Sequence, residues 1–136
     1  MTSVHFDTLF ATPSQARMSA ADYIAAPQSA HKSDLIEGVF VMASPSFLAH
    51  VKLEGFLQTT LSNFVSYYDL GEVLGPKAAY KLNDENVFQP DVSFIHKERL
   101  HLVRDVYVDG PPDIAVEVIS PSSRLYDLIE KRINYG

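Results

Sequence analysis

Apolar and polar positions recur along this chain with two different periods, which predict a mixture of helices and strands. Between residues 48 and 68, apolar side chains return every three or four positions, as expected for a long helix opened by Pro45 and Ser46. Shorter apolar runs, bounded by turn-forming residues, predict strands. The expected strands cover residues 35–42 (two segments joined at Glu37-Gly38), 71–80 (interrupted near Gly75-Pro76), 87–95 and 113–119.

The two ends of the chain complete this outline. Residues 1–18 have mixed polarity without a sustained period, and we expect them to form a loosely docked N-terminal arm. Ser19 predicts the cap of a short helix over residues 20–25, and Ser120-Pro121 predicts the start of a last helix that reaches about Tyr135. The elements therefore predict an α/β fold, a mixed β-sheet flanked by helices, in one domain over residues 19–136.

Composition and charge narrow the class of protein. The chain has 136 residues, of which 46% are hydrophobic and 21% charged, as in a soluble globular domain. The net charge of −6 argues against passive coating of nucleic acid, which needs a broadly basic surface. With no cysteine, a disulfide scaffold or a thiolate zinc site is excluded. Neither a secretory signal nor a membrane-spanning run is recognisable, so we expect a cytoplasmic protein without a membrane partner.

Two carboxylates stand inside apolar runs that otherwise read as buried strands. They are Asp91 in Gln-Pro-Asp at 89–91 and Glu117 in Val-Glu-Val-Ile-Ser at 116–120. A lone buried carboxylate is costly to desolvate unless a positive charge meets it. Side chains alternate along strands, so Asp91 and Glu117 share a face if the two strands are neighbours with their apolar sets aligned. Such a pair offers the oxygen ligands that Mg²⁺ or Mn²⁺ accepts.

Other charged residues leave alternatives open. Asp127, Lys131 and Tyr135 line one face of the last expected helix, from which Lys131 could lean over the metal, although an ordinary pair with Asp127 is the simpler interpretation. Asp113 competes with Asp91, but it stands at a turn, where aspartate commonly caps backbone. The histidines show no zinc-ligand spacing, and His50 reads as a residue that forms a hydrogen bond in a helix start or in the core.

Several motifs in order make the chain recognisable: Asp34-Leu35-Ile36-Glu37-Gly38, Ser44-Pro45 with His50, Gln89-Pro90-Asp91, and Glu117 to Ser122 with Asp127, Lys131 and Tyr135. The set resembles the Uma-two family of bacterial restriction-endonuclease-like proteins, in the PD-(D/E)XK nuclease superfamily. The resemblance implies a Mg²⁺- or Mn²⁺-dependent endonuclease that hydrolyses phosphodiester bonds in DNA. It places the metal on Asp91 and Glu117, the catalytic lysine on Lys131 and an early acidic position on Asp34, where the family usually has glutamate.

Two departures from the family pattern keep other readings open. The superfamily's usual lysine position is Ile119 here, so catalysis would depend on Lys131. The chain ends where similar proteins continue into further strands, as a C-terminally truncated chain would. Because cutting both strands of a duplex usually takes two sites, a homodimer is expected. The alternatives are a catalytically inactive nucleic-acid- or protein-binding module on the same fold, and an assembly protein in which Glu117 and Lys131 form a buried ion pair.

Overall fold

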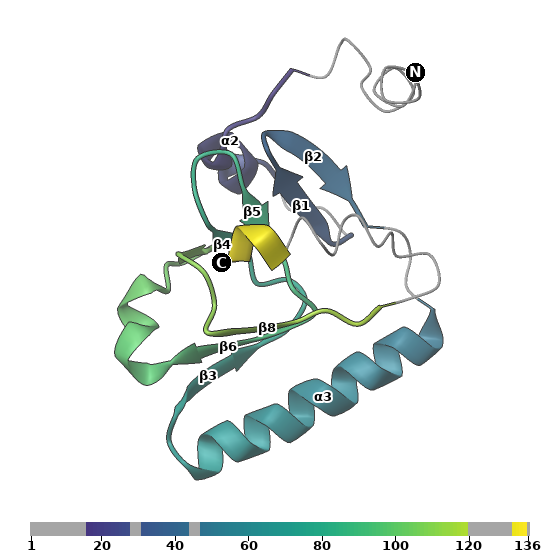
Figure 1. Ribbon diagram of the computed structural model, residues 1–136, viewed down its shortest axis with the longest axis vertical. Helices are drawn as coiled ribbons and strands as arrows, with labels where there is room; N and C mark the ends of the chain where they lie inside the picture. The colour runs from purple at the N-terminus through teal and green to yellow at the C-terminus, as the bar shows by residue number, and fades with distance from the viewer. Residues whose placement is uncertain (1–15, 28–30, 44–46, 120–131, 136) are drawn as a thin grey trace.

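The computed structural model describes residues 16–27, 31–43, 47–119 and 132–135 of the chain, and Figure 1 shows the path of the backbone. In chain order the elements are α2 (Ala20–Ala25), β1 (Ser33–Ile36), β2 (Val39–Met42), α3 (Leu48–Tyr67), β3 (Gly71–Leu74), β4 (Tyr80–Lys81), β5 (Val87–Phe88), β6 (Val92–His96), the 3-10 helix η1 (Lys97–Leu102), β7 (Val108–Asp109) and β8 (Ile114–Val116). Residues 132–135 form a helical turn.

The strands form two sheets with helices packed beside them. One sheet has the order β2-β1-β5-β4-β7 and the other the order β3-β6-β8. The first sheet is mixed, because β4 and β7 run parallel while the other pairs are antiparallel. The predicted α/β fold with a mixed sheet and flanking helices is therefore confirmed. The division into two sheets was not foreseen.

One long, bent hairpin links the two sheets. Residues 71–81 run antiparallel to residues 87–96, with Val73 opposite Phe94 in one sheet and Tyr80 opposite Phe88 in the other. The prediction of one continuous strand over 87–95 was wrong, because Pro90 has no N–H group for a strand ladder and β5 ends before it. Asp91 thus lies at the bend, immediately before β6.

The N-terminal part of the fold follows the sequence pattern closely. The Ser19 hydroxyl accepts a hydrogen bond from the Asp22 N–H at 3.1 Å, which confirms the predicted cap of α2. β1 and β2 form the predicted hairpin, whose turn places Glu37 and Gly38 at positive φ angles of 49° and 78°. Glycine suits the second position because side chains other than glycine are strained there.

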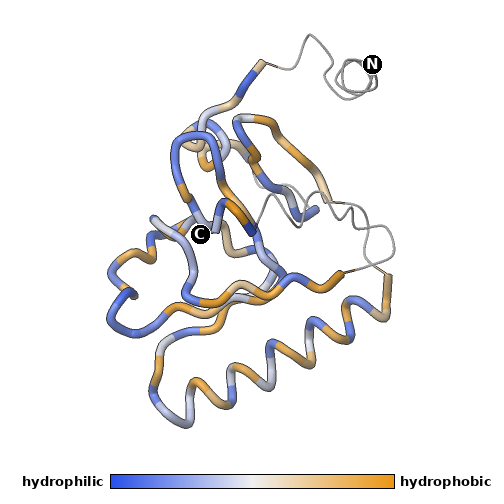
Figure 2. The backbone as a smooth tube through the Cα atoms, viewed as in Figure 1, coloured by the Kyte–Doolittle hydropathy of each residue, from blue (hydrophilic) through white to orange (hydrophobic). Residues whose placement is uncertain are grey.

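Helix α3 packs along β3 and β6, on one side of the three-stranded sheet (Figure 1). Its apolar periodicity predicted the helix correctly but overestimated its burial. Val65 is its only buried residue, whereas Phe56 and Phe64 are more than half exposed. Figure 2 shows apolar and polar positions interspersed along the whole helix. Within the described residues, no helix combines the length and apolarity needed to cross a bilayer.

The core lies between the bent hairpin and its neighbours. One cluster gathers Ala20, Leu35, Ala79 and Val87, and a second gathers Tyr80, Ile95 and Val108. β6 is the most buried of the longer strands after β1, and four of its five residues are buried. The expectation that the apolar run over residues 113–119 forms a buried strand was wrong, because β8 is short, lies at the edge of its sheet and leaves Ile114 exposed.

Candidate metal centre

The candidate site is centred on Asp91, which the bend of the hairpin buries at the start of β6. The side chain is 5% exposed. Its Oδ2 atom accepts a hydrogen bond of 2.6 Å from the Val118 N–H, which belongs to the segment that follows β8. Because the backbone donor comes from the neighbouring strand segment, the same contact fixes the carboxylate and ties the two strands together.

The register of the sheet brings Glu117 to the same place. Val92 pairs with Val116 in antiparallel strands, so Asp91 and Glu117 are the next opposed positions along the two chains. Lys32 joins them, with its Nζ atom 2.6 Å from Asp91 Oδ1 and 3.4 Å from Glu117 Oε2. The two carboxylates therefore meet around one positive charge.

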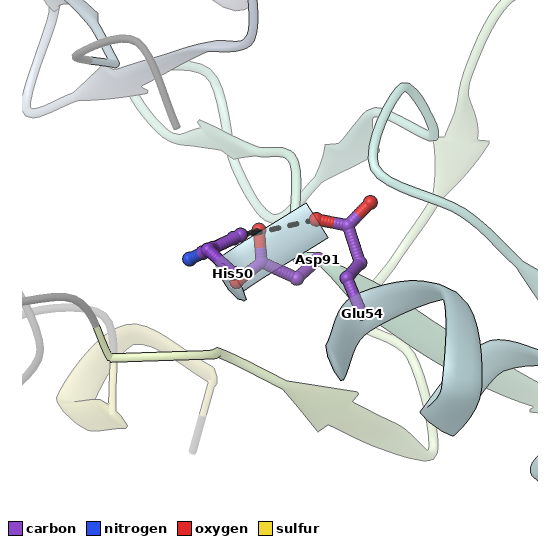
Figure 3. A group of neighbouring side chains, drawn as sticks. All are labelled: His50, Glu54 and Asp91. Atoms are coloured by element: carbon purple, nitrogen blue, oxygen red, sulfur yellow. Dashed lines mark ion pairs between the residues drawn. The ribbon is translucent and has the colours of Figure 1, made fainter. Parts of the chain in front are cut away.

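Helix α3 adds two more potential ligands from the other side, His50 and Glu54. They are one helical turn apart and face the sheet, as Figure 3 shows. His50 Nε2 lies 3.3 Å from Glu54 Oε2 and 3.6 Å from Asp91 Oδ1. One ligand atom of each of His50, Glu54 and Asp91 lies within 4.8 Å of the others. Within the described residues, His50 Nδ1 is buried and has no hydrogen-bond partner.

Burial and neighbouring charges set the acidity of these groups. Burial alone would raise the pKa of Asp91, but the Lys32 charge and hydrogen bond, with the Val118 N–H, lower it below its usual range. The pKa of Glu54 is raised, first by burial and then by the negative charge of Asp91. The carboxylate pair of Asp91 and Glu54 is thus held close at an electrostatic cost, which a cation of higher charge would relieve.

The donor set fits a divalent cation. Three carboxylates (Asp91, Glu117 and Glu54) supply the hard oxygen atoms that Mg²⁺ and Mn²⁺ prefer, and His50 adds an imidazole nitrogen. The Lys32 ammonium already lies among these oxygens and acts as a stand-in cation. The site therefore both attracts positive charge and has the ligand atoms to hold a metal ion.

Asp34 is buried at the edge of this site and contacts the backbone of the bend. Its Oδ1 atom accepts a hydrogen bond of 2.8 Å from the Gln89 N–H, two residues before Asp91. Tyr135 reaches the same region from the C-terminal helical turn, where its ring packs against Phe88. Burial, with the nearby charges of Glu117 and Asp34, raises the pKa of Tyr135, so its hydroxyl stays protonated.

Asp113 has a different environment from Asp91. Its Oδ2 atom accepts a hydrogen bond of 2.7 Å from the His96 N–H, and its Oδ1 atom lies 3.0 Å from Arg99. Burial alone would raise the pKa of Asp113, but these donors lower it. Asp113 thus caps backbone at the turn before β8, as its position in the sequence indicated.

Replacing Asp113 with asparagine should reduce stability near neutral pH by about 0.5–1 kcal/mol, because the pair with Arg99 is partly exposed to solvent. The folded carboxylate has a lowered pKa, so its contribution is present above the unfolded pKa and is lost as the pH falls through the folded one. Urea unfolding of both proteins at pH 7 and pH 3 should show the difference shrinking at acid pH. An undiminished difference at pH 3 would contradict this role.

The sequence analysis did not identify two residues of the site, Glu54 and Lys32, and a third residue that it did predict, Lys131, is not among those described. Glu54 could have been found, because His50 and Glu54 are spaced four apart on a predicted helix and so share a face. Lys32 gave no signal, since it stands 59 positions before Asp91 in the sequence. Lys131 and its neighbour Asp127 lie outside the described residues.

Comparisons with known proteins agree with this fold. No curated protein matches the chain. A solved structure, described as a "putative nuclease belonging to DUF820 from Anabaena variabilis ATCC 29413", superposes with a TM-score of 0.74 at 13% sequence identity. The match covers 87% of this chain and 67% of that one, and it supports a restriction-endonuclease-like fold. The family model of Uma2, described as "Putative restriction endonuclease", matches residues 20–136, and the chain therefore belongs to the Uma2 family.

Proposed function

We propose that this protein is a Mg²⁺- or Mn²⁺-dependent endonuclease that hydrolyses phosphodiester bonds in DNA. The family and the fold support a nuclease. The observation that carries the proposal is the convergence of Asp91 and Glu117, from neighbouring strand segments, on one positive charge, with Glu54 and His50 beside Asp91. A structural ion pair needs one acid for one base, whereas this site concentrates three acids.

Each residue of the site has a role that follows from its position. Asp91 is the central ligand, because Val118 holds one of its oxygens and the other faces Lys32 and His50. Glu117 and Glu54 flank it, from the segment after β8 and from α3. When bound, the divalent ion would stabilise negative charge on the scissile phosphate and favour ionisation of water. The roles of Lys131, which would position the attacking water or stabilise the developing charge, and of Asp34 as a further acid are proposals that rest on the family resemblance.

The polar atoms around Asp91 also indicate where a substrate would contact the protein. His50 Nδ1 and the Tyr135 hydroxyl are buried, and neither has a hydrogen-bond partner in the part of the chain that the structure describes. Unsatisfied buried donors are rare and are found where a ligand completes them. Both groups surround an acidic site, so each could donate a hydrogen bond to a phosphate oxygen once a cation has offset the negative charge of the carboxylates.

The ion pairs of Lys32 also favour a second candidate function. Lys32 forms ion pairs with Asp91 and Glu117 without any metal, which suits an inactive binding module in which these three residues are structural. Metal binding separates the two functions. A nuclease has a saturable divalent-cation site that depends on Asp91, whereas the inactive module has none.

The direct test is a cleavage assay with the whole chain. Supercoiled plasmid and single-stranded oligonucleotide are incubated with the protein and either Mg²⁺ or Mn²⁺, and the products are separated on gels. We expect nicked or linear product that appears only with the metal and stops when EDTA is added. Cleavage that continues at full rate in EDTA would contradict metal dependence. Intact substrate in every metal, despite a folded protein, would favour the binding module.

A further inference from the structure

Lys32 is held in a position that a metal ion would need. Its ammonium group lies between Asp91 Oδ1 and Glu117 Oε2, and only 19% of the side chain is exposed. The other Asp91 oxygen already accepts the Val118 N–H. In the metal-free protein, both carboxylate oxygens of Asp91 therefore already have a partner: one accepts a backbone N–H group and the other contacts the Lys32 ammonium group.

The two positive charges compete for the same oxygen atoms. A divalent ion binds a carboxylate oxygen at about 2.1 Å, and the Lys32 ammonium group already contacts Asp91 Oδ1 at 2.6 Å. The ammonium and the ion also repel each other in a site of low solvent access. Binding of the metal to Asp91 Oδ1 is therefore favoured when the Lys32 ammonium group withdraws.

The structure allows the side chain to move while the backbone stays. The Lys32 carbonyl accepts a hydrogen bond of 2.9 Å from the Ala43 N–H, which anchors the residue directly before β1. Four rotatable carbon–carbon bonds separate this anchor from the ammonium group. Rotation of the stem can withdraw the charge from the acids without breaking the β1–β2 hairpin.

We propose that Lys32 is an exchangeable resident cation that holds Asp91 and Glu117 together in the metal-free protein and is displaced when a divalent ion binds. This inference rests on the proposed metal site and adds how that site is regulated. Metal-free protein is thereby protected from repulsion between its buried acids, which would otherwise push the strand segments apart. The exchange lowers the apparent metal affinity, because only the fraction of molecules with Lys32 withdrawn can bind.

Two substitutions at this position are expected to change metal affinity in opposite directions. Lys32→Met keeps the length of the side chain and removes its charge, so Mn²⁺ should bind about tenfold more tightly or better. Lys32→Arg keeps the charge and adds a guanidinium group, which can form bidentate hydrogen bonds with carboxylates. Mn²⁺ should therefore bind the arginine variant more weakly than the wild type. A purely structural lysine would predict weaker or unchanged binding in the methionine variant.

The measurement is calorimetric titration of MnCl₂ into the wild type, both Lys32 variants, Asp91→Asn and Lys97→Met. Lys97→Met is the matched control, because it removes the same charge from an exposed pair with Asp69. Thermal unfolding with and without Mn²⁺ accompanies the titrations. If Lys32→Met folds poorly alone, the exchange predicts that Mn²⁺ restores its melting temperature toward that of the wild type.

The outcomes separate this inference from the proposed function. Tighter binding in Lys32→Met, weaker binding in Lys32→Arg and no change in Lys97→Met support the exchange. Equal gains in Lys32→Met and Lys97→Met would overturn it in favour of a general charge effect. Wild-type binding that Asp91→Asn abolishes, with no gain in Lys32→Met, would refute the exchange and leave the metal site standing. Absence of binding in all variants would refute both.

Discussion

Replacing Asp91 with asparagine is expected to reduce DNA cleavage by about a thousandfold or more, the largest single effect in this protein. The amide has the same shape and can still accept the Val118 N–H, so the strand contact survives. It loses the negative charge that a divalent ion requires. The loss should appear in the rate of plasmid nicking at saturating Mn²⁺, with the folded state verified by circular dichroism and by the unfolding midpoint.

Asp113→Asn serves as the control for this substitution. Asp113 also precedes a strand, but its carboxylate binds Arg99 and the His96 N–H and takes no part in the acid cluster. We expect cleavage within about threefold of the wild type, since its loss affects stability alone. Equal activity in both variants, or a folded Asp91→Asn protein with normal cleavage, would remove Asp91 from the mechanism.

Replacing Asp34 with alanine should destabilise the protein by about 2 kcal/mol, the largest effect on stability that we predict. The substitution leaves the partly buried Gln89 N–H without its acceptor, at the bend that positions Asp91. Asparagine at the same position retains an acceptor oxygen, so Asp34→Asn should lose less than half as much. Urea unfolding of the two variants at pH 7 measures the difference.

The same pair of variants tests the catalytic role that the family resemblance assigns to Asp34. If the residue acts mainly by holding the bend, the folded Asp34→Asn protein cleaves DNA nearly as well as the wild type. If its charge takes part in the reaction, Asp34→Asn loses cleavage while it keeps its stability. A strong loss of cleavage with an unchanged unfolding midpoint would therefore restore the catalytic assignment.

The sequence predicted the acid pair because strand alternation is a local rule. Apolar positions on either side of Asp91 and Glu117 indicated which way each carboxylate points, and the register of β6 and β8 places the two opposite each other. The short helix and the first hairpin were also predictable, because Ser19 and Glu37-Gly38 carry their signals within a few residues.

Other parts of the fold depend on contacts that no local pattern records. Pro90 interrupts the strand ladder, but only the partner strands decide that β5 and β6 enter different sheets. β8 is as apolar as a central strand and still lies at an edge, so its composition predicted more burial than it has. Lys32 reaches the acids only because β1 pairs with β5, and that pairing joins distant segments of the chain.

Under the proposed function, the concentration of charge at Asp91 explains how an acidic protein could act on a nucleic acid. A net charge of −6 opposes approach to DNA, but the carboxylates at this site contribute to that charge only while no divalent ion is bound. Lys32 offsets part of it in the meantime. Under the proposed function, the metal would both complete the site and reduce the electrostatic repulsion between its carboxylates and a phosphate group.

The most direct measurement is anomalous diffraction from crystals of the protein soaked in Mn²⁺, with data collected at the manganese edge. The account predicts an anomalous peak within about 2.5 Å of carboxylate oxygens of both Asp91 and Glu117, with the Lys32 ammonium moved away from them. A peak bound elsewhere in the protein, or crystals in which Lys32 still bridges the two acids at saturating Mn²⁺, would contradict it.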